Sequence, residues 1–339
     1  MTRVARSLCC GIWLLLLMVA TAPAALADAA GPTDYNTEII SIEPAASSIR
    51  VDMIGGDSFV SLEQLEPVEV VILGYQAEPY LRFSTDGTVY ENRRSPAVWL
   101  NQERYSSEQA PSFASADARP EWYVVATDGR YVWHDHRSHW MSPQQPPGAQ
   151  PGDQILEGVI PIQIDGEEVT ITVASFLLDD PSKLPVVFGV ATAALIGVAM
   201  GRSARTRRIA VALAVGIAAA VHGIVAFVSV PSETQPSSLL WLLPVVALVA
   251  AATVLVIQNI TATTVYLDGL TVVAGACTVA WGFSRRLALQ RSLIPSDAPA
   301  WLDRFVITVA LIVGVVVTTH GIIGLLRPQR LRTPNGART

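Results

Sequence analysis

The chain has 339 residues, of which 51% are hydrophobic and 15% are charged, and its formal net charge is −6. This acidic balance argues against a nucleic-acid-binding protein, which would present a basic face. Because the apolar residues concentrate at the two ends of the chain, we expect a soluble middle domain joined to membrane-spanning segments.

The N-terminal residues have the three-part layout of a secretory signal. Arg3 and Arg6 precede an apolar run from Cys9 to Ala20, which small residues follow. We place a signal peptide at residues 1–27, which puts the chain that follows on the outer side of the cytoplasmic membrane. The alternative is an uncleaved anchor helix, which the short apolar run disfavours.

The cysteines limit the chemistry of the mature protein. Cys9 and Cys10 lie inside the signal peptide, and Cys277 lies in an apolar segment near the C-terminus. This distribution excludes an intramolecular disulfide and a cysteine-based zinc site in the mature chain. The soluble domain must therefore be held together by its own core.

Residues 28–180 have the pattern of a β domain. Short runs rich in Ile and Val recur, and Asp86-Gly87, Asp128-Gly129 and Asp165-Gly166 lie between such runs, as tight hairpin turns require. The most regular run predicts that Trp122–Thr127 and Arg130–His136 pair across Asp128-Gly129. Many short strands with few helices predict an all-β, immunoglobulin-like sandwich. The proline-rich stretch 143–153 is expected to be a surface loop.

Five apolar stretches follow, and each is long enough to cross a bilayer, which takes about 20 residues. We place them at Leu184–Met200, Ile209–Val230, Leu239–Ile257, Val265–Phe283 and Phe305–Leu326. They predict an all-α transmembrane bundle over residues 181–330 and a cytoplasmic tail at 331–339. Arginines in the first loop and in the tail agree with the positive-inside rule, whereas Arg285, Arg286 and Arg291 would lie outside.

Three of the five histidines lie within six positions, in the segment Trp133-His134-Asp135-His136-Arg137-Ser138-His139-Trp140-Met141. Residues two apart in a strand point to the same face, so His134 and His136 are natural co-ligands. His139 has the opposite parity and joins them only if the chain turns near Arg137-Ser138.

Three imidazoles suit copper or zinc, and Asp135 or Met141 would complete the coordination shell. The Met141 thioether would favour copper, because sulfur is a soft ligand. The alternative is a structural knot, in which the histidines, Asp135 and Arg137 are hydrogen-bonded and the two tryptophans belong to the core.

A second concentration of polar and aromatic residues lies upstream, and includes Tyr80, Arg82, Glu91 and Arg93. These residues form a salt-bridge network or a partner-binding surface, or they are solvated turn residues around a hairpin.

The external domain resembles a largely uncharacterised family of actinobacterial membrane proteins with a secreted β domain. The matching pieces are Gly74-Tyr75…Glu78-Pro79-Tyr80-Leu81-Arg82, Tyr90-Glu91-Asn92-Arg93…Ser95-Pro96 and the histidine segment. The resemblance implies a bacterial membrane protein and no known activity. The architecture is also similar to that of copper-resistance proteins that join a β-sandwich to a membrane bundle, although their methionine-rich motif is missing here.

His222 and His320 lie in predicted spans, where ionisable residues are costly and often functional. The surrounding residues are similar, with the same glycine-to-histidine spacing in Gly216…His222-Gly223 and Gly314…His320-Gly321. This similarity is either an inverted repeat, as in many transporters, or a chance match between small-residue helices.

No catalytic motif stands out, so we expect a protein that is not an enzyme. The leading expectation is a metal-binding protein of the bacterial envelope, with copper ahead of zinc, anchored in the plasma membrane with its sandwich outside. One alternative is an interaction module with structural histidines that docks an envelope protein, and another is a transporter with an external sensing domain. Membrane lipid is the expected partner in each case, and nucleic acid is not.

Overall fold

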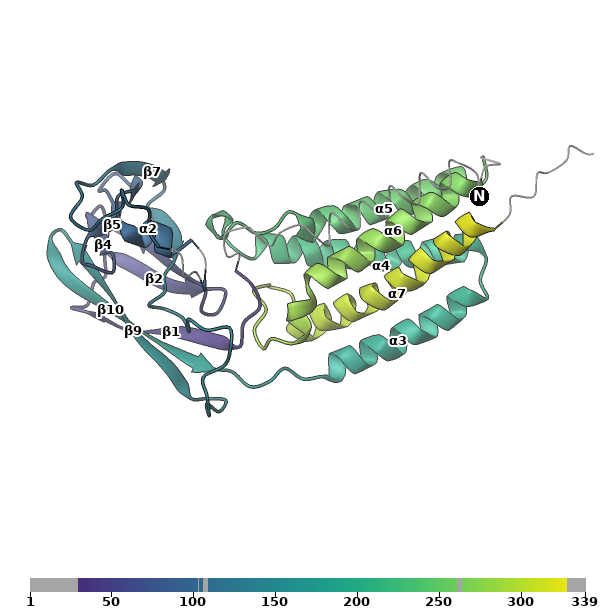
Figure 1. Cartoon of the computed structure of the whole chain (residues 1–339), viewed down its shortest axis with the longest axis horizontal. Helices are drawn as coiled ribbons and strands as arrows, with labels where there is room; N and C mark the ends of the chain where they lie inside the picture. Colours follow the sequence, from purple (N-terminus) through teal and green to yellow (C-terminus); the bar gives the residue numbers. More distant parts are fainter. Residues whose placement is uncertain (1–29, 103, 106–108, 261–263, 328–339) are drawn as a thin grey trace, which may run out of the picture.

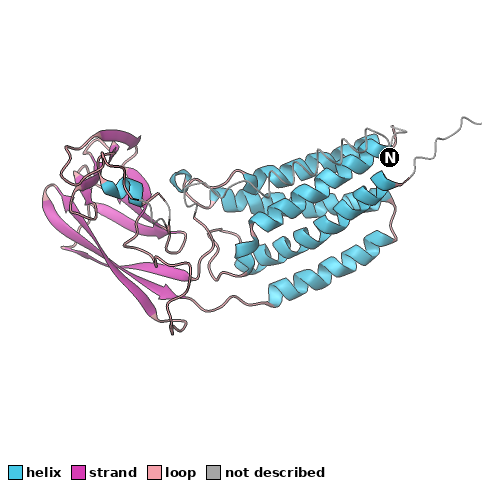
Figure 2. Cartoon of the chain, in the orientation of Figure 1, coloured by secondary structure: helices cyan, strands magenta, loops and turns pink. Residues whose placement is uncertain are grey.

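The protein consists of a β-sandwich followed by a bundle of long helices, as predicted (Figure 1). The computed structural model describes residues 30–102, 104–105, 109–260 and 264–327. The predicted signal peptide and cytoplasmic tail lie outside these ranges. The strands and the long helices occupy opposite ends of the molecule (Figure 2).

The sandwich contains two antiparallel sheets. Its strands are β1 (Tyr35–Glu43), β2 (Ile49–Ile54), β3 (Phe59–Gln64), β4 (Val70–Leu73), β5 (Pro79–Phe83), β6 (Val89–Asn92), β7 (Trp122–Ala126), β8 (Arg130–His134), β9 (Gln154–Ile164) and β10 (Glu167–Leu177). The larger sheet has the order β1-β10-β9-β4-β5-β6-β7, and the smaller sheet has the order β2-β3-β8. A short helix, α2 (Pro96–Leu100), follows β6.

The sandwich has a hydrophobic core of its own. Alternate residues of β10, such as Val169, Ile171 and Val173, are buried between the sheets, as a strand with one inward face requires. The residues buried in this core all come from the sandwich, and each large side chain contributes about 2 kcal/mol by leaving water. The domain is therefore built to fold as a unit.

The Asp-Gly turns behave differently from one another. β9 pairs with β10 across Asp165-Gly166, and β5 pairs with β6 across Asp86-Gly87, as predicted. The predicted hairpin at Asp128-Gly129 is wrong, because β7 pairs with β6 and β8 pairs with β3. Gly129 has a φ of +71°, so the turn exists, but it carries the chain from one sheet to the other. β8 buries its last three residues although it is the edge strand of the smaller sheet.

Within its described residues the helical part contains five long helices, which overlap all five predicted spans. They are α3 (Leu184–Gly201), α4 (Arg205–Val228), α5 (Leu239–Ile257), α6 (Thr264–Ser284) and α7 (Ala300–Leu326). Each is long and apolar enough to cross a membrane. Two short 3-10 helices, η1 (Ser232–Thr234) and η2 (Arg286–Leu289), lie in the connections at the end nearest the sandwich.

The connection between α6 and α7 holds the sandwich against the bundle. Thr33 and Leu293 exchange two backbone hydrogen bonds, of 3.1 and 2.9 Å. The Asp34 carboxylate accepts hydrogen bonds from the Ser292 amide at 3.0 Å and from Arg291 at 2.5 Å. Arg291, which the positive-inside pattern leaves unexplained, therefore has a counter-ion in the sandwich.

Candidate metal centre

The histidine segment ends a strand and then reverses direction. β8 ends at His134, and the Ser138 amide donates to the Asp135 carbonyl at 3.0 Å, which closes a turn. The prediction that His134 and His136 share a strand face is therefore wrong, because His136 already lies in the turn. The chain does turn near Arg137-Ser138, the condition under which His139 joins the other two, and the turn returns His139 to the side of His134.

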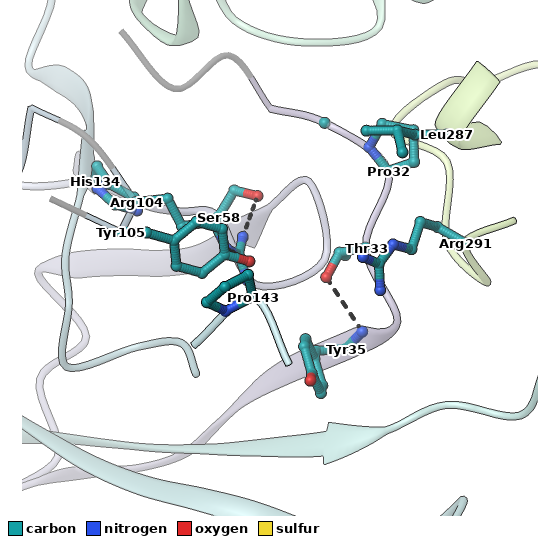
Figure 3. Close-up of a pocket in the computed structure, with 11 residues that line it drawn as sticks. Pro32, Thr33, Tyr35, Ser58, Arg104, Tyr105, His134, Pro143, Leu287 and Arg291 are labelled. Atoms are coloured by element: carbon teal, nitrogen blue, oxygen red, sulfur yellow. Dashed lines mark hydrogen bonds between the residues drawn. The ribbon is translucent and has the colours of Figure 1, made fainter. Parts of the chain in front are cut away.

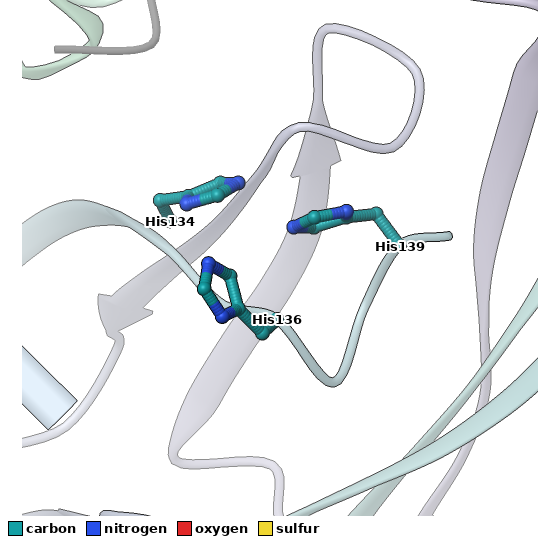
Figure 4. A group of neighbouring side chains, drawn as sticks. All are labelled: His134, His136 and His139. Atoms are coloured by element: carbon teal, nitrogen blue, oxygen red, sulfur yellow. The ribbon is translucent and has the colours of Figure 1, made fainter. Parts of the chain in front are cut away.

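The turn brings the three imidazoles together (Figure 4). The rings of His134 and His139 are stacked, with centroids 4.6 Å apart and planes 21° apart. His136 stands edge-on to both, at 5.2 Å from His134 and 5.5 Å from His139. One ring nitrogen from each residue can be chosen so that all lie within 4.8 Å of one another. Nitrogens bound to one tetrahedral ion at about 2.1 Å lie about 3.4 Å apart, so the rings would have to move closer together to bind one ion.

Hydrogen bonds determine which ring nitrogen of His134 and of His139 carries the proton and which has a free lone pair. The Nδ1 atom of His134 lies 3.1 Å from the Asn101 carbonyl oxygen, and that of His139 lies 3.1 Å from the Trp140 carbonyl oxygen. A carbonyl oxygen only accepts, so each Nδ1 carries the proton and each Nε2 of a neutral ring carries a lone pair. Both Nε2 atoms are buried and have no hydrogen-bond partner among the described residues.

Burial keeps these two rings neutral. It lowers the pKa of His134 to about 3, and the nearby His136 adds to the effect. Burial lowers the pKa of His139 to about 2, and the nearby His134 adds to that effect. Only a neutral imidazole binds a metal ion, so both rings are in the binding form at neutral pH.

Asp135 supports the turn. Its carboxylate accepts hydrogen bonds from the Trp133 indole at 3.1 Å and from the Arg137 guanidinium at 2.7 and 2.8 Å. Burial alone would raise the pKa of Asp135, but these bonds and the Arg137 charge lower it below its usual range. The group of side chains that converges contains the three histidines without Asp135. Met141, the other proposed ligand, is 41% exposed.

Two neighbours outside the histidine segment help to place it. The Tyr75 hydroxyl accepts a hydrogen bond from the His136 amide at 3.0 Å and donates one to the Asn101 side chain. Gly158 of β9 passes so close to the turn that an added Cβ would lie 1.8 Å from the Arg137 carbonyl oxygen. No sequence pattern pointed to Asn101 or Gly158, because both contacts depend on how distant strands are arranged.

A cavity of about 270 Å³ lies between the sandwich and the bundle, and His134 forms part of its wall (Figure 3). Tyr35, Ser58 and Arg104 line the sandwich side, and Arg291 lines the bundle side. Arg104 is paired with the buried carboxylate of Asp57, so its charge is compensated. The cavity therefore reaches His134, at the edge of the histidine group.

The upstream residues do not form the predicted surface as a whole. Tyr80 is 3% exposed and belongs to the core, so its assignment to a surface is wrong. Arg82 lies between the rings of Tyr90 and Trp122, at 4.8 and 4.9 Å, and Arg93 lies 3.8 Å from the ring of Tyr123. Glu91 is partly buried, which raises its pKa. These arginines stack on aromatic rings of β6 and β7.

The two histidines of the bundle have separate surroundings. His222 of α4 lies 3.0 Å from the Asp303 carboxylate of α7, which also binds Arg285. This buried group lies at the end of the bundle nearest the sandwich and gives Arg285 a counter-ion. His320 bonds to the Val316 carbonyl at 2.8 Å and lines a cavity at the opposite end.

Comparisons with known proteins add no relative. A scan against protein-family models, a search of curated proteins and a search of solved structures each found no match to this chain. The resemblance to actinobacterial membrane proteins therefore stays a prediction.

Proposed function

We propose that this protein is a membrane-anchored metal-binding protein whose sandwich holds a transition-metal ion through His134, His136 and His139. The observation that carries the proposal is the pair of buried Nε2 atoms without a hydrogen-bond partner among the described residues. A buried acceptor left unpaired costs about 1–3 kcal/mol, and a bound ion would replace that cost with a ligand bond.

The surroundings of the rings also support a metal site. Metal-binding histidines usually donate the other ring N–H to a carbonyl or carboxylate, which fixes the ring orientation. His134 and His139 both do so through Nδ1. We place copper ahead of zinc, because divalent copper binds nitrogen ligands more tightly than zinc does. Metal handling at the outer face of a bacterial membrane would follow, with the five apolar helices as the anchor.

A metal count on the full chain tests the proposal. The purified protein is loaded with Cu(II) or Zn(II) in detergent, dialysed and assayed for bound metal. We expect about one ion per chain, and loss of that ion in the double variant His134→Gln/His139→Gln. His320→Gln is the matched control, because it removes a histidine at the opposite end of the bundle, and it should retain the ion. A metal content unchanged by His134→Gln and His139→Gln together would refute the proposal.

The competing proposal is an interaction module in which the same histidines are structural. The hydrogen bonds of Asp135, Arg137 and Tyr75 around the turn favour a knot of this kind. It predicts that the histidine variants lose stability in the absence of metal and that metal adds none to the wild-type protein. The metal site predicts the opposite result, with stabilisation that rises with the metal concentration.

A further inference from the structure

A second cavity lies at the end of the bundle distant from the sandwich. It has a volume of about 180 Å³, and α3, α4, α6 and α7 all contribute to its wall. Its charged and titratable lining residues are Arg205, Arg208, Asp268, His320 and Arg327. The start of α4, which carries Arg205 and Arg208, and the end of α7 lie far from the strands in Figure 1.

The lining carries more positive than negative charge. Arg205 bonds to the Asp268 carboxylate at 2.5 Å. Arg208 lies within electrostatic reach of Arg205, Arg327 and Asp268. The cavity therefore has three guanidinium groups and one carboxylate. One oxygen of that carboxylate, on Asp268, is bonded to Arg205. The group has the charge of a site for an anion.

The arginines near this cavity differ in how far they are exposed to solvent, which distinguishes the cavity from a loop of solvated basic residues. Arg202 and Arg207 of the same region are exposed, as solvated charges at a membrane surface would be. Arg205 and Arg208 are only partly exposed, because they line the cavity between helices. Removing a guanidinium from water without a counter-ion is unfavourable, so a bound anion would stabilise this arrangement.

Two features of the cavity indicate the kind of anion. Guanidinium groups bind phosphate oxygens through paired hydrogen bonds. The volume suits a phosphate group and lies below the roughly 300–1,000 Å³ of pockets that enclose a drug-sized ligand. Ile323 also lines the cavity and is 45% exposed, so an apolar surface for an acyl chain lies beside the arginines.

We propose that this cavity binds the phosphate group of an anionic phospholipid, held by Arg205, Arg208 and Arg327. Basic pockets between transmembrane helices bind lipid headgroups in this way. The proposal rests on the membrane placement of the bundle proposed above, and it does not depend on metal binding in the sandwich. The lipid would belong to the leaflet on the side of the membrane away from the sandwich.

Lipid binding by the full chain in detergent tests the proposal. Phosphatidylglycerol, phosphatidylcholine and inorganic phosphate are each titrated against delipidated protein. Bound lipid is counted by native mass spectrometry, and thermal protection by each of the three is measured by thermal shift. We expect phosphatidylglycerol to bind about tenfold more tightly than phosphatidylcholine. We expect Arg208→Gln and Arg327→Gln each to weaken that binding about tenfold, since each removes a charge-assisted bond.

The matched control is Arg207→Gln, which removes the same charge from an exposed position and should change the affinity by less than twofold. Arg327 is exposed, so its variant should fold even if Arg208→Gln does not. Equal binding of the two lipids, or an equal effect of Arg207→Gln and Arg327→Gln, would overturn the proposal. Thermal protection by inorganic phosphate equal to that by phosphatidylglycerol would overturn the lipid assignment. The copper count and recovery from carbonate-washed membranes test the metal site and the membrane placement separately.

Discussion

The Nδ1 atom of His134 lies 3.1 Å from the carbonyl oxygen of Asn101, a residue 33 positions earlier in the chain. Asn101 follows α2, so a backbone carbonyl from outside the histidine segment determines which nitrogen of His134 is left without a proton. His139 obtains the same arrangement from the carbonyl of Trp140. The two stacked rings therefore present the same type of nitrogen, which makes them equivalent ligands.

The first prediction concerns the pH dependence of the metal-free sandwich. Folding lowers the pKa values of His134 and His139 from 6.5 to about 3 and about 2. Between pH 6.5 and 3 the unfolded chain binds protons that the folded chain does not, so the free energy of unfolding falls as the pH falls. At pH 5 the loss is about 2 kcal/mol for each ring. Urea unfolding of residues 28–180 in EDTA, at pH 7 and at pH 5, measures it.

The control for this prediction is the double variant His134→Gln/His139→Gln. Its free energy of unfolding should differ much less between pH 7 and pH 5 than that of the wild-type sandwich. An unfolding free energy of the wild-type sandwich that is the same at pH 7 and pH 5 would show that the two rings are solvated, and the account of the site would be wrong.

The second prediction concerns the ion pair below the turn. Arg137→Met leaves the Asp135 carboxylate buried without its counter-ion, which costs about 3–5 kcal/mol of stability. The matched control is Arg50→Met, because the Arg50–Glu63 pair lies in the same domain with side chains 56% and 41% exposed. Its loss should cost about 0–1 kcal/mol. Equal effects of the two variants, measured by urea unfolding of the sandwich, would contradict the role given to Arg137.

The third prediction concerns the close approach of β9 to the turn. A Cβ at Gly158 would lie 1.8 Å from the Arg137 carbonyl oxygen, so Gly158→Ala must displace either the strand or the turn. We expect the free energy of unfolding to fall by about 1–3 kcal/mol. We also expect weaker metal binding, because the turn positions His139. Gly201→Ala is the control, since its added Cβ meets no atom within 4 Å. Full metal affinity in Gly158→Ala would show that the turn can move without disturbing the site.

The local patterns predicted the classes of structure well. Alternation of branched residues and the Asp165-Gly166 signal predicted β9 and β10, because a tight hairpin is specified by neighbouring residues. The five helices follow from runs of apolar residues alone, because a helix satisfies its own backbone hydrogen bonds. The cluster of His134, His136 and His139 was also visible, since all three residues lie on one short segment.

The remaining features depend on contacts between distant parts of the chain. Asp128-Gly129 has the chemistry of a hairpin turn, and no local signal shows that the strands on its two sides enter different sheets. Asp135 carries a carboxylate that suits a metal, yet Arg137 and Trp133 occupy it once the turn has formed. Arg291 seemed misplaced in the sequence because its counter-ion, Asp34, lies 257 residues away.

The most direct test of the metal site counts the nitrogen ligands of bound copper. Electron paramagnetic resonance of the full chain, loaded with one equivalent of Cu(II), reports nitrogen couplings from coordinated imidazoles. The account predicts couplings from three imidazoles in the wild-type protein, from two in His139→Gln, and from three in the control His320→Gln. A spectrum of copper with oxygen ligands, or one that His139→Gln leaves unchanged, would contradict the proposal that His134, His136 and His139 hold a metal ion.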